Sequence, residues 1–502
     1  MDLNNDCALL TAADIHAVDA HAAQQGISPQ QLMHHAGQAL TTAILQRFPR
    51  SRTLIVCGPG NNGGDGFVIA RLLAARDWPV FVCTEHGALP TRLPAAAHAQ
   101  RYTHDCYSFK AIDEAFLQQV DLIIDAGFGV GLSRPINAHW QSLLQRLENS
   151  QKPIVAVDMP TGVGDFGQLY AHPPLQAELT LALFKKKPAH VIAPGAAYCG
   201  EVRVCDIGLE QTHLPVQPRF YENRPALWAP EWRRTRPNAQ THKYDRGHVW
   251  VWGGPRLPGA PTLSALGAAV SGAGAVTLLT DRDSWPIYAA QMRSVMVEAV
   301  DGAKGFKAAI DTRRTGAVVL GPGAVHCPEL ADYLKVLLDT NHPCVLDAEA
   351  LNVMTQHPDH FFSSLHGRCV LTPHAGEFKR LFPHLTGLLA THRLDAVRQA
   401  SQETGAVVVL KGAETLIGLP HGALIINNNA SPYLATAGSG DVLAGVIAAF
   451  LGQRIAAPLA AAMGVWLHGR AGTLAGVGLI ADDLPKWLIR AQRELIELCE
   501  PE

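Results

Sequence analysis

The chain has little charge and no long run of charges of one sign. Charged residues make up 17% of its 502 residues, below the usual share of about 25%, and no run is longer than Lys185–Lys187. Lysine and arginine total 41 against 44 aspartate and glutamate, whereas a protein that binds many phosphates of a nucleic acid normally carries a basic excess. The composition therefore argues against a nucleic-acid partner and against long disordered or coiled-coil stretches.

Zinc-binding and secretory features are also missing. The 10 cysteines are scattered, with no CxxC pair and no Cys/His cluster of zinc spacing. The opening residues MDLNND are acidic and polar, unlike a signal peptide. The uncharged stretch Leu257–Thr280 is long enough to span a bilayer, but its two prolines and four glycines indicate a buried segment of a soluble fold. We expect a soluble cytoplasmic protein with reduced thiols and no membrane partner.

Hydrophobic residues make up 48% of the chain, enough for two sizeable α/β domains. The segment between Leu209 and Lys243 contains five prolines among polar and basic residues and has no apolar period, which is typical of an extended connector. The predicted division is an N-terminal domain over 1–215, a linker over 216–238 and a C-terminal domain over 239–502. Fragments that end near Leu209 or begin near Pro237 are expected to be soluble.

Short apolar runs alternate with Ala/Leu-rich helical stretches on both sides of this segment. That alternation is typical of α/β domains with parallel sheets. The predicted strands are Thr53–Cys57, Val80–Thr84, Leu122–Asp125, Ile154–Asp158, Val249–Trp252, Ala275–Thr280, Ala317–Leu320, Cys344–Asp347, Cys369–Thr372 and Val407–Leu410.

A glycine-rich loop follows the first of these strands. Gly58-Pro-Gly-Asn-Asn-Gly63 satisfies the GxGxxG pattern between a strand and a helix, and Glu85 ends the next strand, which matches the fingerprint of a dinucleotide-binding fold. Because any tight strand-to-helix turn needs glycine, this loop alone leaves a purely structural role open. Asp65 would repel a pyrophosphate at the helix N-terminus, which argues against an ordinary dehydrogenase.

Two further predicted strands of the N-terminal half end in polar, glycine-rich turns. The carboxyl ends of parallel strands open onto a shared crevice, and oxygen ligands suit hard cations. The side chains expected to meet there are Asn62, Asp125 and Thr161 as cation ligands, and Asp65 and Asp158 facing a bound molecule. The alternative is that Asp125 only caps its own turn and that no ion is present.

Another glycine turn lies near the end of the chain, where Gly438-Ser-Gly440-Asp441 leads into an apolar helix. Successive backbone N–H groups at a helix N-terminus form an anion site, and a carboxylate beside a phosphate is placed to accept a proton from an alcohol. The alternative is that Asp441 only complements the helix dipole. The sequence has no GxxxxGK[ST] motif, which excludes the usual P-loop nucleotide hydrolase.

The three N-terminal turns together resemble the NAD(P)H-hydrate epimerase domain. The NNGGDG loop of that family corresponds to Asn61–Gly66, its second turn to Asp125–Gly131 and its D-x-P-[ST]-G motif to Asp158–Gly162. The resemblance implies a Rossmann-like fold, a potassium ion (K⁺) held by Asn62, Asp125 and Thr161, and Asp158 as a catalytic residue. The residues implied to lie against the hydrated nicotinamide nucleotide are Asn61, Asn62, Gly63, Gly64, Asp65, Gly129, Val130, Gly131, Leu132, Ser133, Arg134, Pro135 and Asp158.

The C-terminal turns together resemble the ADP/ATP-dependent NAD(P)H-hydrate dehydratase domain, a relative of ribokinase-like kinases. Matching motifs include Leu346-Asp-Ala348, Thr372-Pro-His-x-Gly-Glu377 and Gly438-x-Gly-Asp441. The resemblance implies a ribokinase-like fold, ADP or ATP bound with Mg²⁺, and Asp441 as the catalytic base. The implied nucleotide-binding residues are Lys411, Gly412, Ala413, Glu414, Thr415, Thr436, Gly438, Ser439 and Gly440. The implied substrate-binding residues are Ala260, Gly323, His374, Gly376, Glu377, Arg380 and Asp441.

Together the two resemblances imply a bifunctional enzyme that repairs hydrated nicotinamide cofactors, NAD(P)HX. The first domain would interconvert the R and S hydrates, and the second would dehydrate the S form to NAD(P)H at the expense of ADP or ATP. The sequence departs from the family at Ala375, in the loop Trp252–Ala260 and at Arg293-Ser294, which leaves the details of substrate contact open.

Two alternatives remain at this point. One is a small-alcohol or vitamin-precursor kinase fused to a nucleotide-binding regulatory module, and the other is an N-terminal half that binds a nucleotide without activity. A homo-oligomer is expected. The number of subunits and the preferences between ADP and ATP and between NADHX and NADPHX stay open.

Overall fold

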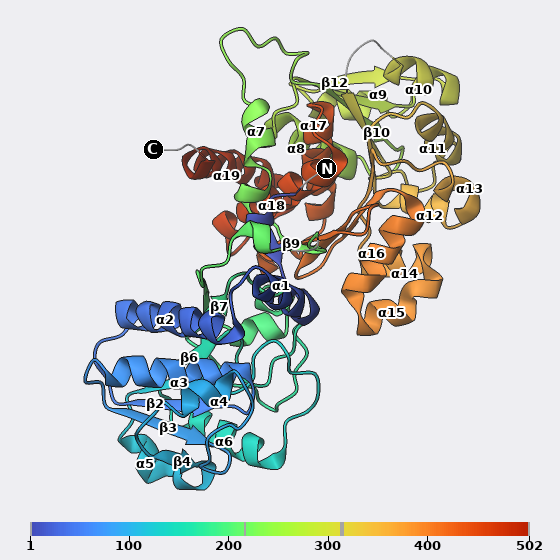
Figure 1. Cartoon of the computed structure of the whole chain (residues 1–502). Coiled ribbons are helices and arrows are strands. Elements are labelled where there is room, and N and C mark those ends of the chain that lie inside the picture. The colour runs from blue at the N-terminus through green and yellow to red at the C-terminus, as the bar shows by residue number, and fades with distance from the viewer. Residues whose placement is uncertain (1–2, 215–216, 312–315, 500–502) are drawn as a thin grey trace. The chain divides into compact units, whose positions relative to one another are not determined.

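The computed structural model describes residues 3–214, 217–311 and 316–499. Contacts divide the chain into two compact units, which can be followed separately in Figure 1. The smaller unit runs from Ala8 to Phe220, and the larger unit consists of the residues up to Cys7 together with Tyr221 onward. The predicted boundary at 215/216 falls outside the described residues. The predicted α/β class is confirmed in both units.

The smaller unit is built around a parallel sheet in the order β4-β3-β2-β5-β6-β7-β8. Its strands are β2 (Thr53–Cys57), β3 (Val80–Thr84), β4 (Cys106–Ser108), β5 (Leu122–Ala126), β6 (Ile154–Val157), β7 (Leu179–Leu183) and β8 (Glu201–Cys205), after a short β1 (Ala8–Leu9). Its α-helices are α1 (Ala12–Gln24), α2 (Pro29–Arg47), α3 (Asn61–Ala74), α4 (Ala95–Ala99), α5 (Glu114–Gln118) and α6 (Ala138–Asn149).

Side chains that alternate along the central strands enter two separate cores. Ile55 of β2 packs with Phe67 of α3 in one hydrophobic cluster, whereas Leu54 packs with Leu143 of α6 in the other. Buried on both faces, β2 and β5 read as continuous apolar runs, as is usual in parallel sheets. The strand order reverses between β2 and β5, and ligands of such sheets bind outside the carboxyl ends at this point.

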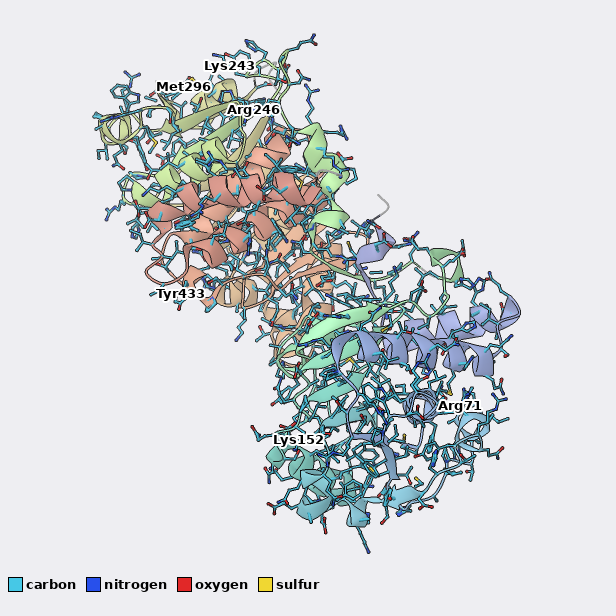
Figure 2. All side chains as sticks on the ribbon, turned by 90° about the vertical axis from the view of Figure 1, so that its left-hand side faces the viewer. Arg71, Lys152, Lys243, Arg246, Met296 and Tyr433 are labelled. Atoms are coloured by element: carbon cyan, nitrogen blue, oxygen red, sulfur yellow. The ribbon has the colours of Figure 1, made fainter. Side chains whose placement is uncertain are left out.

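The larger unit contains a longer sheet, whose central strands run in the order β18-β17-β16-β15-β14-β13-β10-β11-β12. The strands are β9 (Phe220–Glu222), β10 (His248–Gly253), β11 (Ala275–Thr280), β12 (Met296–Ala299), β13 (Gly316–Leu320), β14 (Cys344–Leu346), β15 (Cys369–Leu371), β16 (Val407–Leu410), β17 (Thr415–Gly418) and β18 (Leu424–Asn427). The pairs from β10 to β16 are parallel, and β17 and β18 form antiparallel neighbours. At the edge, β12 carries the half-exposed Met296 (Figure 2).

Helices flank this sheet, and α8 packs closely against α17. The helices are α7 (Ala229–Arg234), α8 (Gly259–Val270), α9 (Trp285–Gln291), α10 (Gly302–Ile310), α11 (Leu330–Asp339), α12 (Glu349–Met354), α13 (Pro358–Phe362), α14 (Ala375–Leu381), α15 (Thr386–Thr391), α16 (Arg393–Thr404), α17 (Ser439–Gly452), α18 (Ala457–Ala475) and α19 (Leu484–Cys499). Within the described ranges, none of the helices combines the length and apolar character that a membrane span requires. All ten cysteines are free thiols.

The middle of the segment predicted as an extended connector, residues 221–232, is folded into the larger unit. Tyr221 of β9 is buried, and Trp228 is completely buried where its ring meets that of Trp466 on α18. The Asn223 side chain receives a hydrogen bond from the Trp228 ring and donates to Asn427 and to the Ala462 carbonyl. Pro225 and Pro230 therefore lie in short helical elements, and this part of the segment is not a solvated linker.

This packing changes the expected limits of a stable C-terminal fragment. A fragment that begins at Pro237 lacks Tyr221, Trp228 and Trp232, all of them buried in the larger unit. Because removing one buried Trp side chain costs about 3–5 kcal/mol, we expect 237–502 to aggregate or to melt well below a fragment of 221–502. Thermal unfolding of both fragments beside the full chain measures the difference, and equal melting temperatures would show that the segment does not stabilise this unit.

Candidate active sites

The glycine loop after β2 is shaped by close backbone approaches. A Cβ atom on Gly63 would lie 1.9 Å from the Gly58 carbonyl oxygen, and one on Gly66 would lie 2.7 Å from the Cys57 sulfur. These contacts leave no room for a side chain at either glycine. The helix α3 begins at Asn61, so both glycines lie in its first turns. The expected loop before the helix is thus mostly helical, and Asp65 lies inside the helix, not at its start.

Asp125 and Thr161 lie together at the carboxyl ends of β5 and β6. The Thr161 hydroxyl donates to Asp125 Oδ1 at 2.6 Å, and the Thr161 backbone N–H donates to Oδ2 at 2.7 Å. The backbone N–H of Gly127 also donates to Oδ1, at 3.1 Å, and that of Phe128 donates to the Thr161 hydroxyl at 2.9 Å. Asp125 therefore ties the two turns to each other, which is more than the capping of its own turn.

The side chains of Asp125 and Asp65 are both buried. Burial raises the pKa of Asp125 to about 6, against the opposing effect of its hydrogen bonds. Burial also raises the pKa of Asp65 well above its usual value, and the neighbouring Asp158 carboxylate adds to this rise. A bound cation or a hydrogen-bond donor from a ligand would relieve the cost of ionising these groups.

The residues expected to hold a cation suit a hard monovalent ion. Asp125, Thr161 and Asn62 offer only oxygen, and Asp125 Oδ2 receives a single hydrogen bond from the described residues, so it retains acceptor capacity. The side-chain nitrogen of Asn62 is buried without a hydrogen-bond partner in the described part of the chain. An unpartnered buried amide is costly, which fits a group that meets a ligand.

Asp158 stands at the third turn in an unusual backbone conformation, with φ +64°. Its Oδ1 accepts from the Leu183 backbone N–H at 3.1 Å and from the ammonium of Lys187. A Cβ on Gly129 would lie 3.3 Å from Asn62 Oδ1 and 3.4 Å from Asp158 Oδ2. The structure thus brings Asn62, Gly129 and Asp158 together, as the sequence predicts.

Two residues at this site were missed by the sequence analysis. Lys187, read there only as part of a charge run, is buried beside Asp158, and His190 lies with its Nε2 atom 2.8 Å from the Asp158 carbonyl oxygen. No sequence motif links Lys187 or His190 with Asp158. The pairing of β6 with β7 brings them close together in space. Of the second predicted turn, Leu132 is buried, whereas Gly131, Ser133, Arg134 and Pro135 are exposed.

In the larger unit, the turns at the ends of β13 and β14 touch each other. Gly321 has φ +121°, and a Cβ on it would lie 1.8 Å from the Asp347 carbonyl oxygen. A Cβ on Gly323 would lie 2.5 Å from the carbonyl oxygen of Leu257, in the loop before α8. Ala260 lies in the first turn of α8. The predicted substrate residues Gly323 and Ala260 therefore occupy adjoining loops.

The ends of β14 and β16 meet the N-terminus of α17. Lys411 donates to Asp347 Oδ1 at 2.8 Å, and a Cβ on Gly440 would lie 3.3 Å from the Lys411 ammonium nitrogen. Burial lowers the pKa of Lys411, but the carboxylates around it, above all Asp347, outweigh burial and raise it. The sequence analysis named Asp347 only as part of a motif and did not predict it as a site residue. In the structure it forms an ion pair with Lys411.

Asp441 lies in the first turn of α17, directly after Gly438–Gly440, the turn expected to bind the phosphates and called the anion turn below. Its pKa is raised to about 6, first by burial and then by the Asp347 and Glu377 carboxylates, while Lys411 acts in the opposite sense. A group with such a pKa is ionised near neutral pH but accepts a proton readily, which suits a general base. Its backbone carbonyl accepts from the Ser264 hydroxyl at 2.8 Å, which fixes α17 against α8.

His374 ends the turn after β15 and caps α14. Its Nδ1 accepts from the backbone N–H of Gly376 at 2.9 Å, while Glu377 accepts from the His374 backbone N–H at 2.8 Å. The Lys411 backbone N–H donates to the Pro373 carbonyl at 2.9 Å, so this turn adjoins the Lys411 turn. Arg380, one turn further along α14, is exposed and donates to Asn352.

The rest of the predicted nucleotide region is open to solvent at several points. Gly412 and Ala413 are exposed, whereas Glu414 and Thr415 are buried, Glu414 being paired with Arg393. Tyr433 has 46% of its surface exposed and precedes the Gly438 turn (Figure 2). The Ser439 hydroxyl lies 3.1 Å from His468 Nε2, and burial lowers the pKa of that histidine to about 4.

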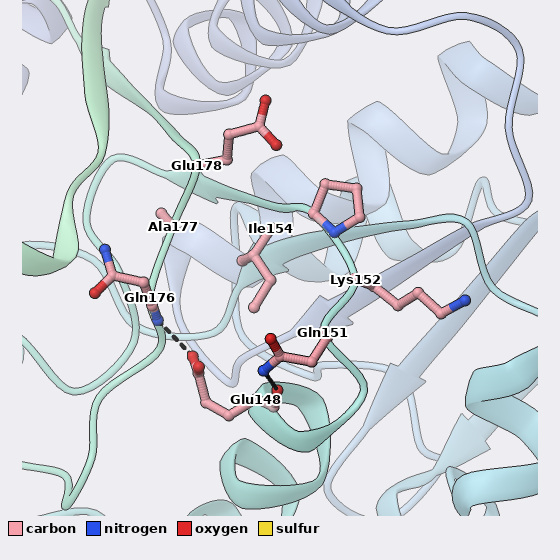
Figure 3. A pocket seen from close by; sticks show the side chains of 8 residues that line it. Glu148, Gln151, Lys152, Ile154, Gln176, Ala177 and Glu178 are labelled. Carbon is pink, nitrogen blue, oxygen red and sulfur yellow. Dashed lines mark hydrogen bonds between the residues drawn. The ribbon is translucent and has the colours of Figure 1, made fainter.

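A polar hollow in the smaller unit lies away from these turns. It is lined by Glu148, Gln151, Lys152, Pro153, Ile154, Gln176, Ala177 and Glu178 (Figure 3). Because Ile154 is the first residue of β6, the hollow lies at the amino ends of the strands. It is therefore separate from the candidate site at the carboxyl ends.

Comparisons with known proteins match each unit separately and the chain as a whole. A family described as "YjeF-related protein N-terminus" matches residues 29–189, and a family described as "NAD(P)H-hydrate dehydratase" matches residues 249–490. The bifunctional NAD(P)H-hydrate repair enzyme of Moorella thermoacetica is 34% identical, with 98% of each chain covered. That of Escherichia coli is 30% identical over 94% of this chain and 92% of its own. Among solved structures, the ADP/ATP-dependent NAD(P)H-hydrate dehydratase of Bacillus subtilis, co-crystallised with ATP and Mg²⁺, is 27% identical with a TM-score of 0.45, covering 53% of this chain and 98% of that chain.

Proposed function

The chain belongs to the family of bifunctional NAD(P)H-hydrate repair enzymes, and on this basis we propose how its two units divide the reaction. The smaller unit epimerises R- and S-NAD(P)H hydrate, and the larger unit dehydrates the S form to NAD(P)H at the expense of ADP or ATP. The observation that carries this assignment is that the two family matches fall one in each unit, within relatives matched over nearly their whole length.

We propose that Asp441 takes the proton of the ring hydroxyl of the S hydrate as that oxygen attacks the terminal phosphoryl group of the nucleotide. Gly438–Gly440 present backbone N–H groups to the phosphates at the start of α17, and Lys411 lies beside Gly440. Phosphorylation converts the hydroxyl into a good leaving group. Loss of inorganic phosphate, together with a proton from the neighbouring ring carbon, then restores the double bond.

We propose that Mg²⁺ accompanies the nucleotide and supplies charge neutralisation at the phosphates. Magnesium at such sites is held mainly by phosphate oxygens and water. Two carboxylates adjoin Gly438–Gly440: Asp347 Oδ2 would lie 3.9 Å from a Cβ on Gly440, and Asp441 follows in the first turn of α17.

For the epimerase site we propose that K⁺, bound through Asn62, Asp125 and Thr161, holds the three turns in register. Asp158 Oδ2 and the loop from Gly129 then face the hydrated nicotinamide ring. Support comes from the hydrogen bonds that join Asp125 to Thr161. The Asn62 NH2 group, which has no partner among the described residues, is a donor and would meet an acceptor atom of the nucleotide while its oxygen serves the ion. A homo-oligomeric assembly and a cytoplasmic location remain predictions.

The kinase alternative differs from this function in its product. Incubation of the protein with S hydrate and ADP or ATP should yield one reduced cofactor, seen by its absorbance, for each inorganic phosphate released. A small-alcohol kinase would instead accumulate a phosphorylated product and release no phosphate. Phosphate assay and absorbance in the same reaction separate the two.

The pKa of Asp441 predicts the pH dependence of dehydration. Because the base must be ionised, the value of kcat/KM should fall about tenfold per pH unit below about pH 6 and level off above it. Initial rates with S hydrate across this range measure the profile. An unchanged rate well below pH 6 would show that ionised Asp441 is not required.

A further inference from the structure

Lys187 is buried in the smaller unit although its side chain is charged. The side chain is 1% exposed and forms an ion pair with Asp158, while its ammonium also donates to the Leu183 carbonyl oxygen at 3.0 Å. An unpaired buried ammonium is strongly disfavoured. Its position is therefore intelligible only together with Asp158, which faces the proposed epimerase site.

The two carboxylate oxygens of Asp158 have different surroundings. Oδ1 is fixed by the Leu183 backbone N–H at 3.1 Å and by Lys187. Oδ2 lies on the side of Gly129, near the place that the Asn62 amide also approaches. The lysine thus occupies one oxygen and leaves the other directed toward the turn at which the substrate is expected.

His190 fixes the backbone on both sides of this pair. Its Nδ1 accepts from the Lys187 backbone N–H at 3.0 Å, so the ring donates through Nε2 to the Asp158 carbonyl oxygen, 2.8 Å away. Burial lowers the pKa of His190 to about 3, which keeps the ring neutral and this hydrogen-bond pattern intact. The ring thereby supports the left-handed backbone of Asp158, a conformation that non-glycine residues rarely adopt.

Other carboxylates crowd the same region. Asp65, Asp19 and Asp165 each lie close enough to Asp158 for its charge to raise their pKa values, after the larger effect of burial. Repulsion between these carboxylates and Asp158 would tend to displace its side chain. The ammonium of Lys187 opposes this displacement, since its positive charge lies against Oδ1.

We propose that Lys187 is a positioning residue of the epimerase. Its ammonium holds Oδ1 of Asp158 in place, so that Oδ2 accepts a hydrogen bond from the hydroxyl of the hydrated ring, and His190 fixes the backbone that carries both groups. This inference rests on the epimerase function proposed above and adds to it a residue outside the three turns that carry the family resemblance.

The test uses the full chain, with its dehydratase activity as an internal reference. In Lys187→Met, which keeps the apolar stem, the epimerase kcat per folded molecule should fall about 10²-fold, the scale of a misplaced catalytic group. In Lys187→Arg, which keeps the charge, most of this loss should be recovered. Dehydration of pure S hydrate should stay at the wild-type rate in both, and Lys185→Met, a neighbouring lysine outside the buried pair, serves as the matched control.

A second variant covers the case in which Lys187→Met unfolds the smaller unit. His190→Gln keeps both charges and should lower the epimerase kcat about tenfold while the KM for the hydrate stays within about twofold, because the carboxylate is loosened but not removed. The proposal is overturned if His190→Gln keeps the wild-type epimerase kcat and Lys187→Met, where it folds, keeps it as well. A wild-type protein without epimerase activity would instead overturn the proposed function of the smaller unit.

Discussion

Replacing Asp441 by asparagine is expected to lower the dehydratase turnover roughly 10²–10⁴-fold, the usual contribution of a general base. The amide cannot accept the proton of the ring hydroxyl, whereas the shape of the side chain is retained. Nucleotide binding should persist, because the backbone N–H groups of Gly438–Gly440 and the Lys411–Asp347 pair remain in place.

The control for this variant is an aspartate with only a structural position. Asp332 stands in the first turn of α11, where it complements a helix dipole as Asp441 would under the alternative interpretation. Asp332→Asn should leave turnover unchanged. Single-turnover rates with S hydrate and a nucleotide-binding titration on both variants make the comparison, and full activity in Asp441→Asn would rule out its role as the base.

The second large effect is expected at Asp125. Asp125→Ala removes the acceptor of two hydrogen bonds from Thr161, which join the turns after β5 and β6, and of one from Gly127 within its own turn. It also removes the only charged ligand of the proposed K⁺ site. We expect the epimerase rate to fall about 10²-fold, since displacement of the turns misplaces Asp158. Dehydration of pure S hydrate in the larger unit should be nearly unchanged.

The ion itself can be tested in the wild type. Replacing K⁺ in the buffer by a large organic cation should mimic the Asp125→Ala loss, and added K⁺ should not restore the variant. Asp121→Ala, a surface aspartate paired with Arg52 just before β5, is the matched control. An epimerase rate indifferent to both the cation and Asp125 would mean that these turns need no ion and that Asp125 does not organise them.

The sheets of both units were well predicted, because buried parallel strands appear as continuous apolar runs. Thr53–Cys57, Val80–Thr84, Ala275–Thr280 and Val407–Leu410 were predicted with the bounds that the structure shows. Other strands were not predicted, among them the buried β7, β17 and β18 and strands with a weak apolar signal. In the edge strand β8, Glu201 and Arg203 are exposed and only Cys205 is buried.

The connector was misjudged because five prolines outweighed the aromatic residues among them. The spacing of Tyr221, Trp228 and Trp232 follows neither a helical nor a strand period, yet each side chain is buried in the larger unit. Proline marks where a chain turns, but it does not show whether the residues between the turns find a core to enter. That depends on distant segments such as β18 and α18.

The candidate sites show the same limit. The glycine turns were found because they are local motifs, and the structure brings Asn62, Gly129 and Asp158 together at one of them. Lys187 and His190 contribute through strand pairing, and nothing in their local sequence predicted burial. The sequence analysis noted Lys185–Lys187 only as the longest run of charges, although its last member is buried and paired with Asp158.

Conversion of pure R hydrate by the full chain tests the central claim most directly. R hydrate can yield NAD(P)H only if the smaller unit first epimerises it and the larger unit then dehydrates the S form. With ADP or ATP present, we predict complete conversion at a rate above that of spontaneous epimerisation, with one inorganic phosphate released per reduced cofactor. Asp125→Ala should slow this reaction about 10²-fold while pure S hydrate is still converted. Consumption of nucleotide without any gain in reduced-cofactor absorbance, or conversion of R hydrate no faster than without the enzyme, would contradict the account.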